Sequence, residues 1–150
     1  MKRLATHITI AIFALLALSG CTKNNGDIGN WFGLWHVDNI EIDGIDDSGY
    51  DGNFYFLFQG KVFCIRWVDE VNHESIEGYA QWQESDDGKT MTVNFVDSNY
   101  SPTLYGAVPQ THLSTVNTFD VVTLNNEKMV LQLTDPETGI SYTYYLTCWK

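Results

Sequence analysis

Residues 53–68 read NFYFLFQGKVFCIRWV, and this stretch decides the fold. Two runs rich in aromatic and β-branched residues flank Gln59-Gly60, a tight-turn signal, so the stretch predicts a β-hairpin. Successive side chains of a strand point to opposite faces, so the first run gathers three rings on one face: Phe54, Phe56 and Phe58. The second run does the same with Phe63, Ile65 and Trp67. One face of this hairpin is therefore aromatic enough to line a core or a pocket.

The rest of the chain after residue 30 repeats this pattern and shows no sustained helical period. Short runs of β-branched and aromatic residues between turn residues predict eight strands, at residues 35–42, 53–58, 61–68, 78–83, 90–96, 115–124, 128–133 and 140–149. Because no segment is left for crossover helices, we expect consecutive strands to pair antiparallel.

The connections between these strands alternate in length. Three are tight, at residues 59–60, 86–88 and 125–127, and four are longer, at residues 43–52, 69–77, 97–114 and 134–139. In a meander, successive connections fall at opposite ends, so the tight turns gather at one end and the longer loops at the other. This predicts an all-β fold, an eight-stranded antiparallel up-and-down β-barrel with a closed floor and an open mouth. A two-sheet sandwich would not predict such strict alternation.

The composition excludes several classes of function. The 150-residue chain has 8 Lys+Arg and 19 Asp+Glu, a formal charge of −11. Such a negative field repels nucleic acid, whereas 44% hydrophobic residues suffice for a folded core. The sequence has no G-x-S-x-G or other nucleophile motif, so we predict that the chain is not an enzyme. We also expect no cofactor, and a monomer.

The N-terminal residues have the features of a targeting signal. Lys2 and Arg3 precede an apolar run at residues 8–18, which is too short to span a bilayer and ends in Leu18-Ser19-Gly20-Cys21. This order resembles the signal peptide and lipobox of bacterial lipoproteins. The resemblance implies cleavage after residue 20, a diacylglycerol on the thiol of Cys21 and an acyl chain such as palmitate on its amine. An ordinary secretory signal with a chance cysteine is the alternative.

Lipidation at Cys21 implies a membrane partner and a place in the cell envelope. The segment at residues 21–30 is small, polar and rich in Gly and Asn, so we interpret it as a flexible tether before a domain at residues 31–150. An Asp directly after the lipidated cysteine resembles an inner-membrane retention signal. This chain has Thr22 at that position, so we expect anchoring in the outer membrane. The mature chain would be still more acidic, because cleavage removes Lys2 and Arg3.

The first predicted strand begins with Gly33-Leu34-Trp35, which resembles the Gly-x-Trp signature of lipocalins. Small bacterial lipoproteins with lipocalin-like domains share this whole order of lipobox, polar tether, Gly-x-Trp, β-meander with a Gly60-Lys61 turn, and aromatic last strand. The resemblance implies that Gly33 and Trp35 form the barrel floor and that the barrel is lipocalin-like. A fatty-acid-binding-protein-like or other calycin-type barrel remains open.

Two functions are compatible with such a barrel. The first is a carrier that binds a small apolar or aromatic ligand in the barrel or at its mouth. The second is a non-enzymatic envelope module that binds a protein or glycan through its mouth loops, in which case side chains fill the barrel. The candidate ligand-binding residues face the lumen or lie in the mouth loops: Tyr50, Phe54, Phe56, Trp67, Tyr100, Leu104, Tyr105, Tyr142 and Tyr144.

The mouth loops also hold potential metal ligands, and we predict no metal site among them. Four aspartates lie within residues 43–52, but their spacing does not match an EF-hand, so a solvated acidic turn is the better interpretation. His73 and His112 would lie in two other mouth loops, and neither has a partner at zinc-binding spacing.

Two cysteines remain once Cys21 is acylated. Cys64 and Cys148 both fall near the predicted floor, and an oxidising compartment permits a disulfide between them. Two other strands separate theirs in the closed order, so the bond requires the C-terminal tail to cross the floor. The sequence leaves this disulfide open.

Overall fold

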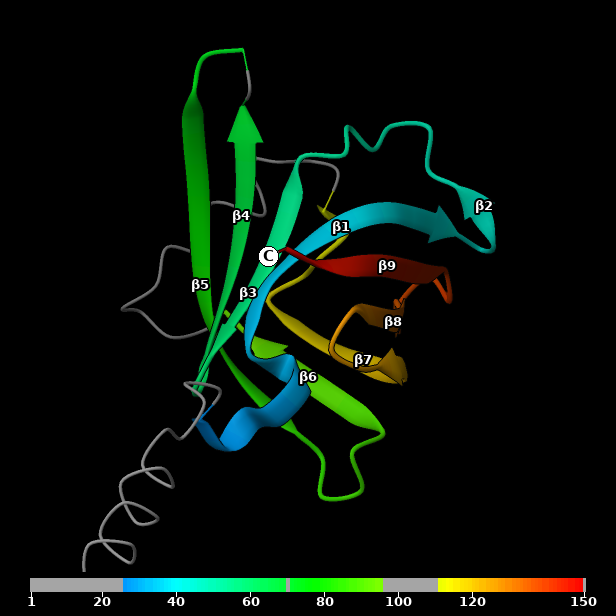
Figure 1. Cartoon of the computed structure of the whole chain (residues 1–150). Coiled ribbons are helices and arrows are strands. Elements are labelled where there is room, and N and C mark those ends of the chain that lie inside the picture. The colour runs from blue at the N-terminus through cyan, green and yellow to red at the C-terminus, as the bar shows by residue number, and fades with distance from the viewer. Residues whose placement is uncertain (1–25, 70, 96–110, 150) are drawn as a thin grey trace, which may run out of the picture.

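A computed structural model of the chain describes residues 26–69, 71–95 and 111–149. Its eight long strands form one antiparallel sheet in chain order, and the last strand pairs with the first to close a barrel (Figure 1). Their bounds are β1 Gly33–Ile42, β3 Phe54–Gln59, β4 Val62–Asp69, β5 Glu74–Glu84, β6 Thr90–Asn94, β7 Val116–Leu124, β8 Lys128–Thr134 and β9 Ser141–Trp149. This confirms the predicted fold class.

The two ends of the barrel differ as the loop lengths predict. At the mouth, the imidazole Nε2 of His112 lies 2.7 Å from Asp47 Oδ2. This contact joins the loop before β7 to the loop after β1. The amide of Asp43 donates to the carbonyl of Ser141, so the start of β9 meets the same rim. At the floor, the indole of Trp82 donates to the carbonyl of Gly60 at 2.9 Å. The long and the tight connections therefore gather at opposite ends.

A short helix packs against the floor of the barrel before the first strand. Gly26–Trp31 forms the 3-10 helix η1, which overlaps the predicted tether at residues 26–30 and ends at the first residue of the predicted domain. Trp31 is buried, and its ring centroid lies 5.2 Å from that of Phe58 and 5.1 Å from that of Trp82. Burial of this large aromatic side chain holds the helix against the floor. The predicted signal peptide, Cys21 and the remaining tether residues 21–25 lie outside the described residues.

A small addition and two irregularities shape the wall. The two-residue strand β2 (Ile45–Asp46) folds back onto the end of β1 and widens the mouth loop. The β1–β9 register shifts between Val37 and Asn39, and the β7–β8 register shifts between Val121 and Thr123. Such bulges bend and twist a strand and so help a sheet to close. Among the residues that the structure describes, no helix is long and apolar enough to cross a bilayer.

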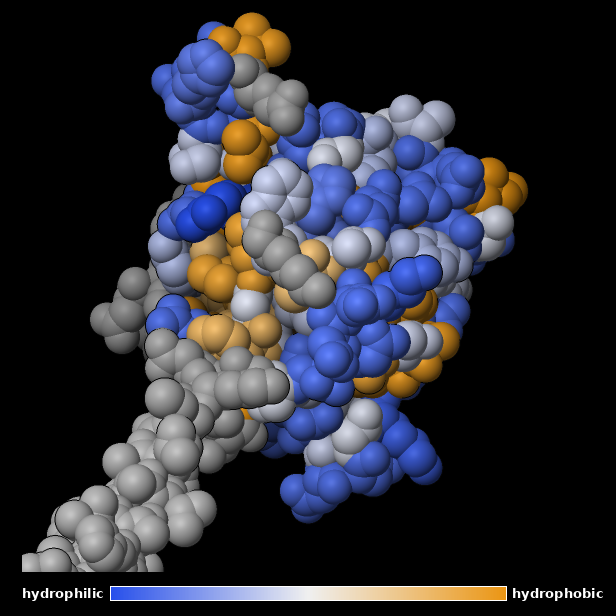
Figure 2. All heavy atoms as spheres, viewed as in Figure 1, coloured by the Kyte–Doolittle hydropathy of each residue, from blue (hydrophilic) through white to orange (hydrophobic). Residues whose placement is uncertain are grey.

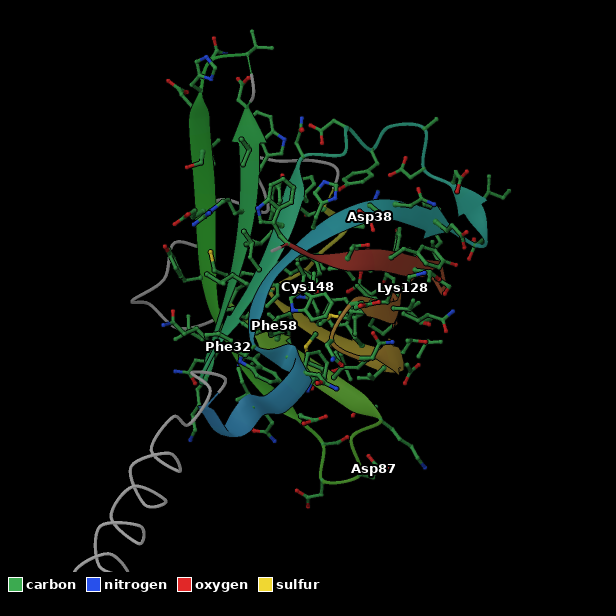
Figure 3. The ribbon with its side chains drawn as sticks, viewed as in Figure 1. Phe32, Asp38, Phe58, Asp87, Lys128 and Cys148 are labelled. Atoms are coloured by element: carbon green, nitrogen blue, oxygen red, sulfur yellow. The ribbon has the colours of Figure 1, made fainter. Side chains whose placement is uncertain are left out.

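The core lies inside the barrel and is strongly aromatic. Alternate residues of every long strand point inward, and Phe58 and Cys148 lie on this inner side, whereas Asp87 lies in a floor turn that projects from the barrel (Figure 3). The largest side chains that are fully buried are Trp31, Trp35, Tyr144, Phe54, Phe56, Phe58, Phe63, Phe95 and Phe119. Trp35 lies at the floor, where its indole N–H donates to the carbonyl of Trp31 at 3.0 Å.

Candidate ligand site at the barrel mouth

The lumen is filled by the side chains that the sequence places there. Phe56 is 1% exposed, and its ring contacts those of Phe63 at 5.1 Å and Tyr144 at 5.8 Å between centroids. The hydroxyl of Tyr144 donates to the carbonyl of Thr111 at 2.8 Å, so its polar end is satisfied inside the barrel. Because the accessible surface areas of Phe56, Phe63 and Tyr144 are near zero, no void large enough for a water molecule adjoins their rings. Phe54, Phe56 and Tyr144 therefore form a packed core and do not line an open pocket.

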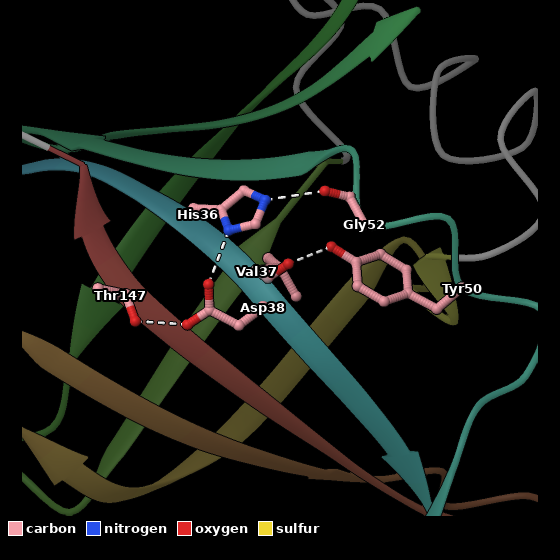
Figure 4. A network of polar contacts seen from close by, with 6 residues as sticks. All are labelled: His36, Val37, Asp38, Tyr50, Gly52 and Thr147. Carbon is pink, nitrogen blue, oxygen red and sulfur yellow. Dashed lines mark hydrogen bonds and ion pairs between the residues drawn. The ribbon is translucent and has the colours of Figure 1, made fainter. Parts of the chain in front are cut away.

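Tyr50 covers the mouth end of this core. Its ring stacks on that of Phe54, with 5.9 Å between centroids and an interplanar angle of 17°. Its hydroxyl donates to the carbonyl of Val37, so the loop residue is fastened to β1 (Figure 4). Burial raises the pKa of the Tyr50 phenol above its ordinary value, which keeps the donor protonated. Tyr50 is thus half-buried and held down on the barrel.

The bulge in β1 organises a polar network on the outer wall below this loop. Asp38 contacts the ring nitrogen Nδ1 of His36 at 2.7 Å and accepts a hydrogen bond from the hydroxyl of Thr147 in β9 (Figure 4). The other ring nitrogen of His36 lies 2.8 Å from the carbonyl of Gly52. The network ties β1, β9 and the mouth loop together, and every polar atom in it has a structural partner.

Two further candidates lie at the rim. Trp67 is half-buried above Phe54, and its indole N–H donates to Asp51 Oδ2 at 2.8 Å. The ring of Tyr142 stacks on that of His112, with centroids 4.7 Å apart and an interplanar angle of 12°. The structure thus brings Tyr50, Trp67 and Tyr142 to the mouth. The other three candidates, Tyr100, Leu104 and Tyr105, lie outside the described residues.

The contact between His112 and Asp47 has an electrostatic consequence. Partial burial alone would raise the pKa of the Asp47 carboxyl, but hydrogen bonds from His112 and the amide of Gly49 outweigh it, so this pKa is lowered. Asp47 is therefore ionised at neutral pH. Its charge pairs two mouth loops that are 65 residues apart in the sequence.

This pair predicts a pH dependence of stability. The pKa of Asp47 is lower in the folded than in the unfolded protein, so its contribution is complete above about pH 4 and is lost as the pH falls through the folded pKa. We expect Asp47→Asn to cost roughly 1 kcal/mol of unfolding free energy at neutral pH and less near pH 3. Urea unfolding of both proteins at several pH values measures this; a difference that does not change with pH would contradict it.

A cleft opens beside His112 that the sequence did not indicate. It has a volume of about 550 Å³ and lies where β7 and β8 diverge at the rim, next to the loop before β9. Val116, Leu133 and Pro136 give it apolar walls, and Asp135 and Glu137 give it an acidic edge. None of these residues was among the sequence candidates. The only sequence signal is Val116, an apolar residue that strand alternation places on the outer face of β7.

The Asp135 carboxylate at this edge is held by its own turn. It accepts hydrogen bonds from the amide of Glu137 at 2.8 Å and from the hydroxyl of Thr138 at 2.8 Å. These bonds lower the pKa of the Asp135 carboxyl, so it stays charged. The cleft therefore presents apolar surface beside a fixed negative charge. A neutral or cationic ligand with an apolar part fits this chemistry.

The disulfide that the sequence left open is not formed. Both thiols are free. Cys148 pairs with Trp35 and points into the barrel, whereas Cys64 pairs with Leu57 and Tyr79 on the outer face. The wall of the barrel thus lies between the two side chains. Burial raises the pKa of the Cys64 thiol to about 12, so the nucleophilic thiolate is scarce.

His73 and His112 do not form a metal site with their neighbours. Within the described residues, no group of three His, Cys, Asp or Glu side chains is placed to hold a metal ion. His112 is engaged by Asp47, and His73 lies in the turn between β4 and β5 with a positive φ of 55°. Two aspartates of residues 43–52 hold the backbone of this loop, since Asp47 accepts a hydrogen bond from the amide of Gly49 and Asp51 accepts one from the amide of Asn53.

Comparison with known proteins identifies the fold. No family model and no curated protein matches the sequence. Among solved structures, a lipocalin-like protein from Bacteroides uniformis matches with a TM-score of 0.60 and 13% identity, over 81% of this chain and 100% of its own. An uncharacterized protein from Bacteroides eggerthii matches with a TM-score of 0.55 and 17% identity, over 79% and 99%. Bovine odorant binding protein, in complex with a selenium-containing odorant, matches with a TM-score of 0.45 and 14% identity, over 83% and 73%.

These findings define the class of protein. The closed eight-stranded barrel and the match to the Bacteroides uniformis protein show that this chain has a lipocalin-like fold. The predicted resemblance to lipocalin-like domains is thereby confirmed at the level of the fold. Gly33 and Trp35 lie at the start of β1, where the resemblance places them.

Proposed function

We propose that this chain is a lipid-anchored lipocalin-like binding protein of the bacterial cell envelope that takes a small molecule in the cleft at its mouth. Lipocalin-like barrels generally bind small hydrophobic ligands. In this chain the described side chains fill the lumen, so the cleft beside His112 is the place for a ligand. The observation that carries the proposal is the volume of this cleft, about 550 Å³, which is in the range of small-molecule sites.

The anchor rests on the lipobox at residues 18–21 and on the order of the elements around it. We propose that Cys21 carries the lipid in the outer membrane and that the mouth faces away from it. The N-terminal helix η1 enters the barrel at the floor, which supports this orientation. Mass spectrometry of the protein from its host envelope tests the anchor, and an unmodified Cys21 or a retained leader would contradict it.

Binding in the cleft is tested with a matched pair of variants on one strand. Val116 lines the cleft and is 50% exposed, whereas Val122 lies further along β7, away from the cleft, and is 59% exposed. We expect Val116→Trp to abolish binding of a neutral apolar dye such as Nile red, because the indole fills the cleft. Val122→Trp should bind like the wild type.

Fluorescence titration of the three proteins measures this. If Val116→Trp and Val122→Trp bind the dye with equal affinity, the dye binds outside the cleft. If the wild type does not bind the dye, this result counts against a small-molecule site. Native mass spectrometry of untagged protein from its host envelope then identifies the natural ligand by mass. Our prediction that the chain is not an enzyme is untouched by these experiments.

The filled lumen favours a second candidate function. A barrel whose described side chains fill its interior binds through its surface, which suits an envelope module that binds a protein or glycan through its mouth loops. Tyr50, one of the aromatic residues expected to form such a surface, is instead stacked on Phe54 and hydrogen-bonded to Val37. The described mouth therefore supports the cleft more than a tyrosine-rich patch.

A further inference from the structure

An apolar row crosses the outer wall of the barrel near its floor. Strand register places five side chains side by side on the outer face, one from each of five neighbouring strands: Trp149, Leu34, Leu57, Cys64 and Tyr79. We call this row the floor belt. The next row toward the mouth is polar in most positions, since His36, Tyr55, Arg66 and Glu77 occupy it.

The floor belt is partly open to solvent. Trp149 is 58% exposed and Tyr79 is 37% exposed, whereas Cys64 between them is buried. Figure 2 shows a hydrophobic area over β3 and β4 on this face, within a surface that is otherwise mostly hydrophilic. Beside the belt, Leu34, Tyr55, Val68, Arg66 and Trp149 line a shallow groove of about 190 Å³. A contiguous apolar patch on an acidic domain indicates a surface with a partner.

The length of chain before the barrel indicates what that partner is. Five residue steps separate Cys21 from Gly26, where η1 begins, and a fully extended chain spans at most roughly 3.5 Å per residue. A lipid on Cys21 thus holds the start of η1 within roughly 17 Å of the bilayer surface. Because β1 begins directly after η1, the belt residue Leu34 lies near this point of attachment.

The charge distribution agrees with a floor that faces lipid. All lysines among the described residues lie in the floor turns or directly next to them: Lys61, Lys89 and Lys128. The described residues of the mouth loops contain neither Lys nor Arg, but they carry acidic side chains such as Asp43, Asp47, Asp51 and Glu137. In the floor turns these lysines are balanced by Asp86, Asp87 and Glu127, whereas no basic side chain balances the acidic ones in the described mouth loops. Anionic phospholipid head groups therefore repel the mouth more strongly than the floor.

We propose that the floor belt lies against the lipid bilayer and sets the orientation of the anchored barrel, an inference that rests on the lipid anchor of the proposed function. Trp149 and Tyr79 suit the head-group region, because each ring has an apolar body and a polar atom. The hydroxyl of Tyr79 donates to Glu77, which points its polar end away from the apolar row. Contact between the floor belt and the bilayer fixes the orientation of the barrel, with the mouth pointing away from the membrane.

Quenching of tryptophan fluorescence by lipid tests the pose. Full-length acylated protein is reconstituted in phosphatidylcholine vesicles whose acyl chains are brominated close to the head groups, and in unbrominated vesicles as the reference. We expect bromine to quench part of the wild-type emission and Trp149→Phe to lose this quenchable part. Trp67→Phe is the matched control, because Trp67 lies at the mouth, and it should be quenched like the wild type.

Each outcome of this experiment bears on the proposal. If the protein does not float with the vesicles, the anchor fails and the belt proposal falls with it. If the protein floats but Trp149→Phe is quenched as strongly as the wild type, the anchor stands and the pose is overturned. A second copy of the chain on the belt would also overturn it, and would show as Trp149 emission that depends on protein density but not on bromine.

Discussion

Trp35→Ala is expected to destabilise the barrel by about 3–5 kcal/mol, the range for truncation of a buried large aromatic side chain. Trp35 is fully buried at the floor, and its indole N–H donates to the carbonyl of Trp31. The substitution therefore opens a cavity, removes a hydrogen bond and loosens η1 from the barrel. Urea unfolding followed by circular dichroism measures the loss, and the midpoint should fall with little change in slope.

Trp149→Ala is the matched control for this prediction. It removes the same type of side chain from β9, but Trp149 is largely exposed on the outer wall. We expect its effect on the free energy of unfolding in solution to stay within roughly 0.5 kcal/mol, as for most surface positions. Equal destabilisation by both variants would show that Trp35 has no special role in closing the floor.

Phe56→Ala is expected to have the second large effect, about 3–5 kcal/mol, and to create a pocket where the wild type has none. Phe56 lies in the middle of the lumen between Phe63 and Tyr144. The void left by its ring is lined by apolar side chains, so it should stay dry and bind benzene or xenon. Urea unfolding and a crystal structure under xenon pressure measure the two effects.

Phe56→Leu controls for the loss of the ring alone. Leucine keeps most of the apolar volume, so we expect a smaller loss of stability and no xenon site. Xenon bound in the lumen of the wild type would show that the barrel holds a cavity after all. In that case the ligand site would move from the mouth cleft to the interior.

The fold could be predicted because its signals are local. Alternation in residues 53–68 reveals the inward faces of β3 and β4, and the contrast between the Gln59-Gly60 turn and the long segment 97–114 sorts the connections between two ends. Each signal needs only a few neighbouring residues, and each agrees with the others. The helix η1 was not predicted, because the composition of a Gly- and Asn-rich stretch does not show that Trp31 at its end packs against Phe58 and Trp82.

The candidate site was predicted only in part, because it depends on contacts across the barrel. Alternation correctly gave the inward faces of Phe54, Phe56 and Tyr144, but it could not tell whether such rings line a void or fill it. The pair of His112 and Asp47 joins loops 65 residues apart, and no local pattern encodes it. The cleft itself arises from divergence of β7 and β8, a feature of geometry and not of residue type.

The disulfide that the sequence left open depends on which face of its strand each cysteine occupies. Both cysteines do lie near the floor, as their distance from the turns indicates. Alternation in β4 places Phe63 and Ile65 inward and hence Cys64 outward, so the sequence already held half of the answer. Alternation in β9 likewise places Cys148 on the inward face of Tyr144, and its pairing with buried Trp35 across the seam agrees with this.

The seam between β1 and β9 also has a consequence for how the chain is made. The first and the last long strands pair along eight register positions, and Thr147 bonds Asp38 across 109 residues of sequence. Contacts this distant in sequence slow folding, because the ends must meet before the sheet gains its closing hydrogen bonds. No closed barrel can exist until β9 has left the ribosome and can reach β1. Until then both strand edges of the sheet are unpaired and open to aggregation.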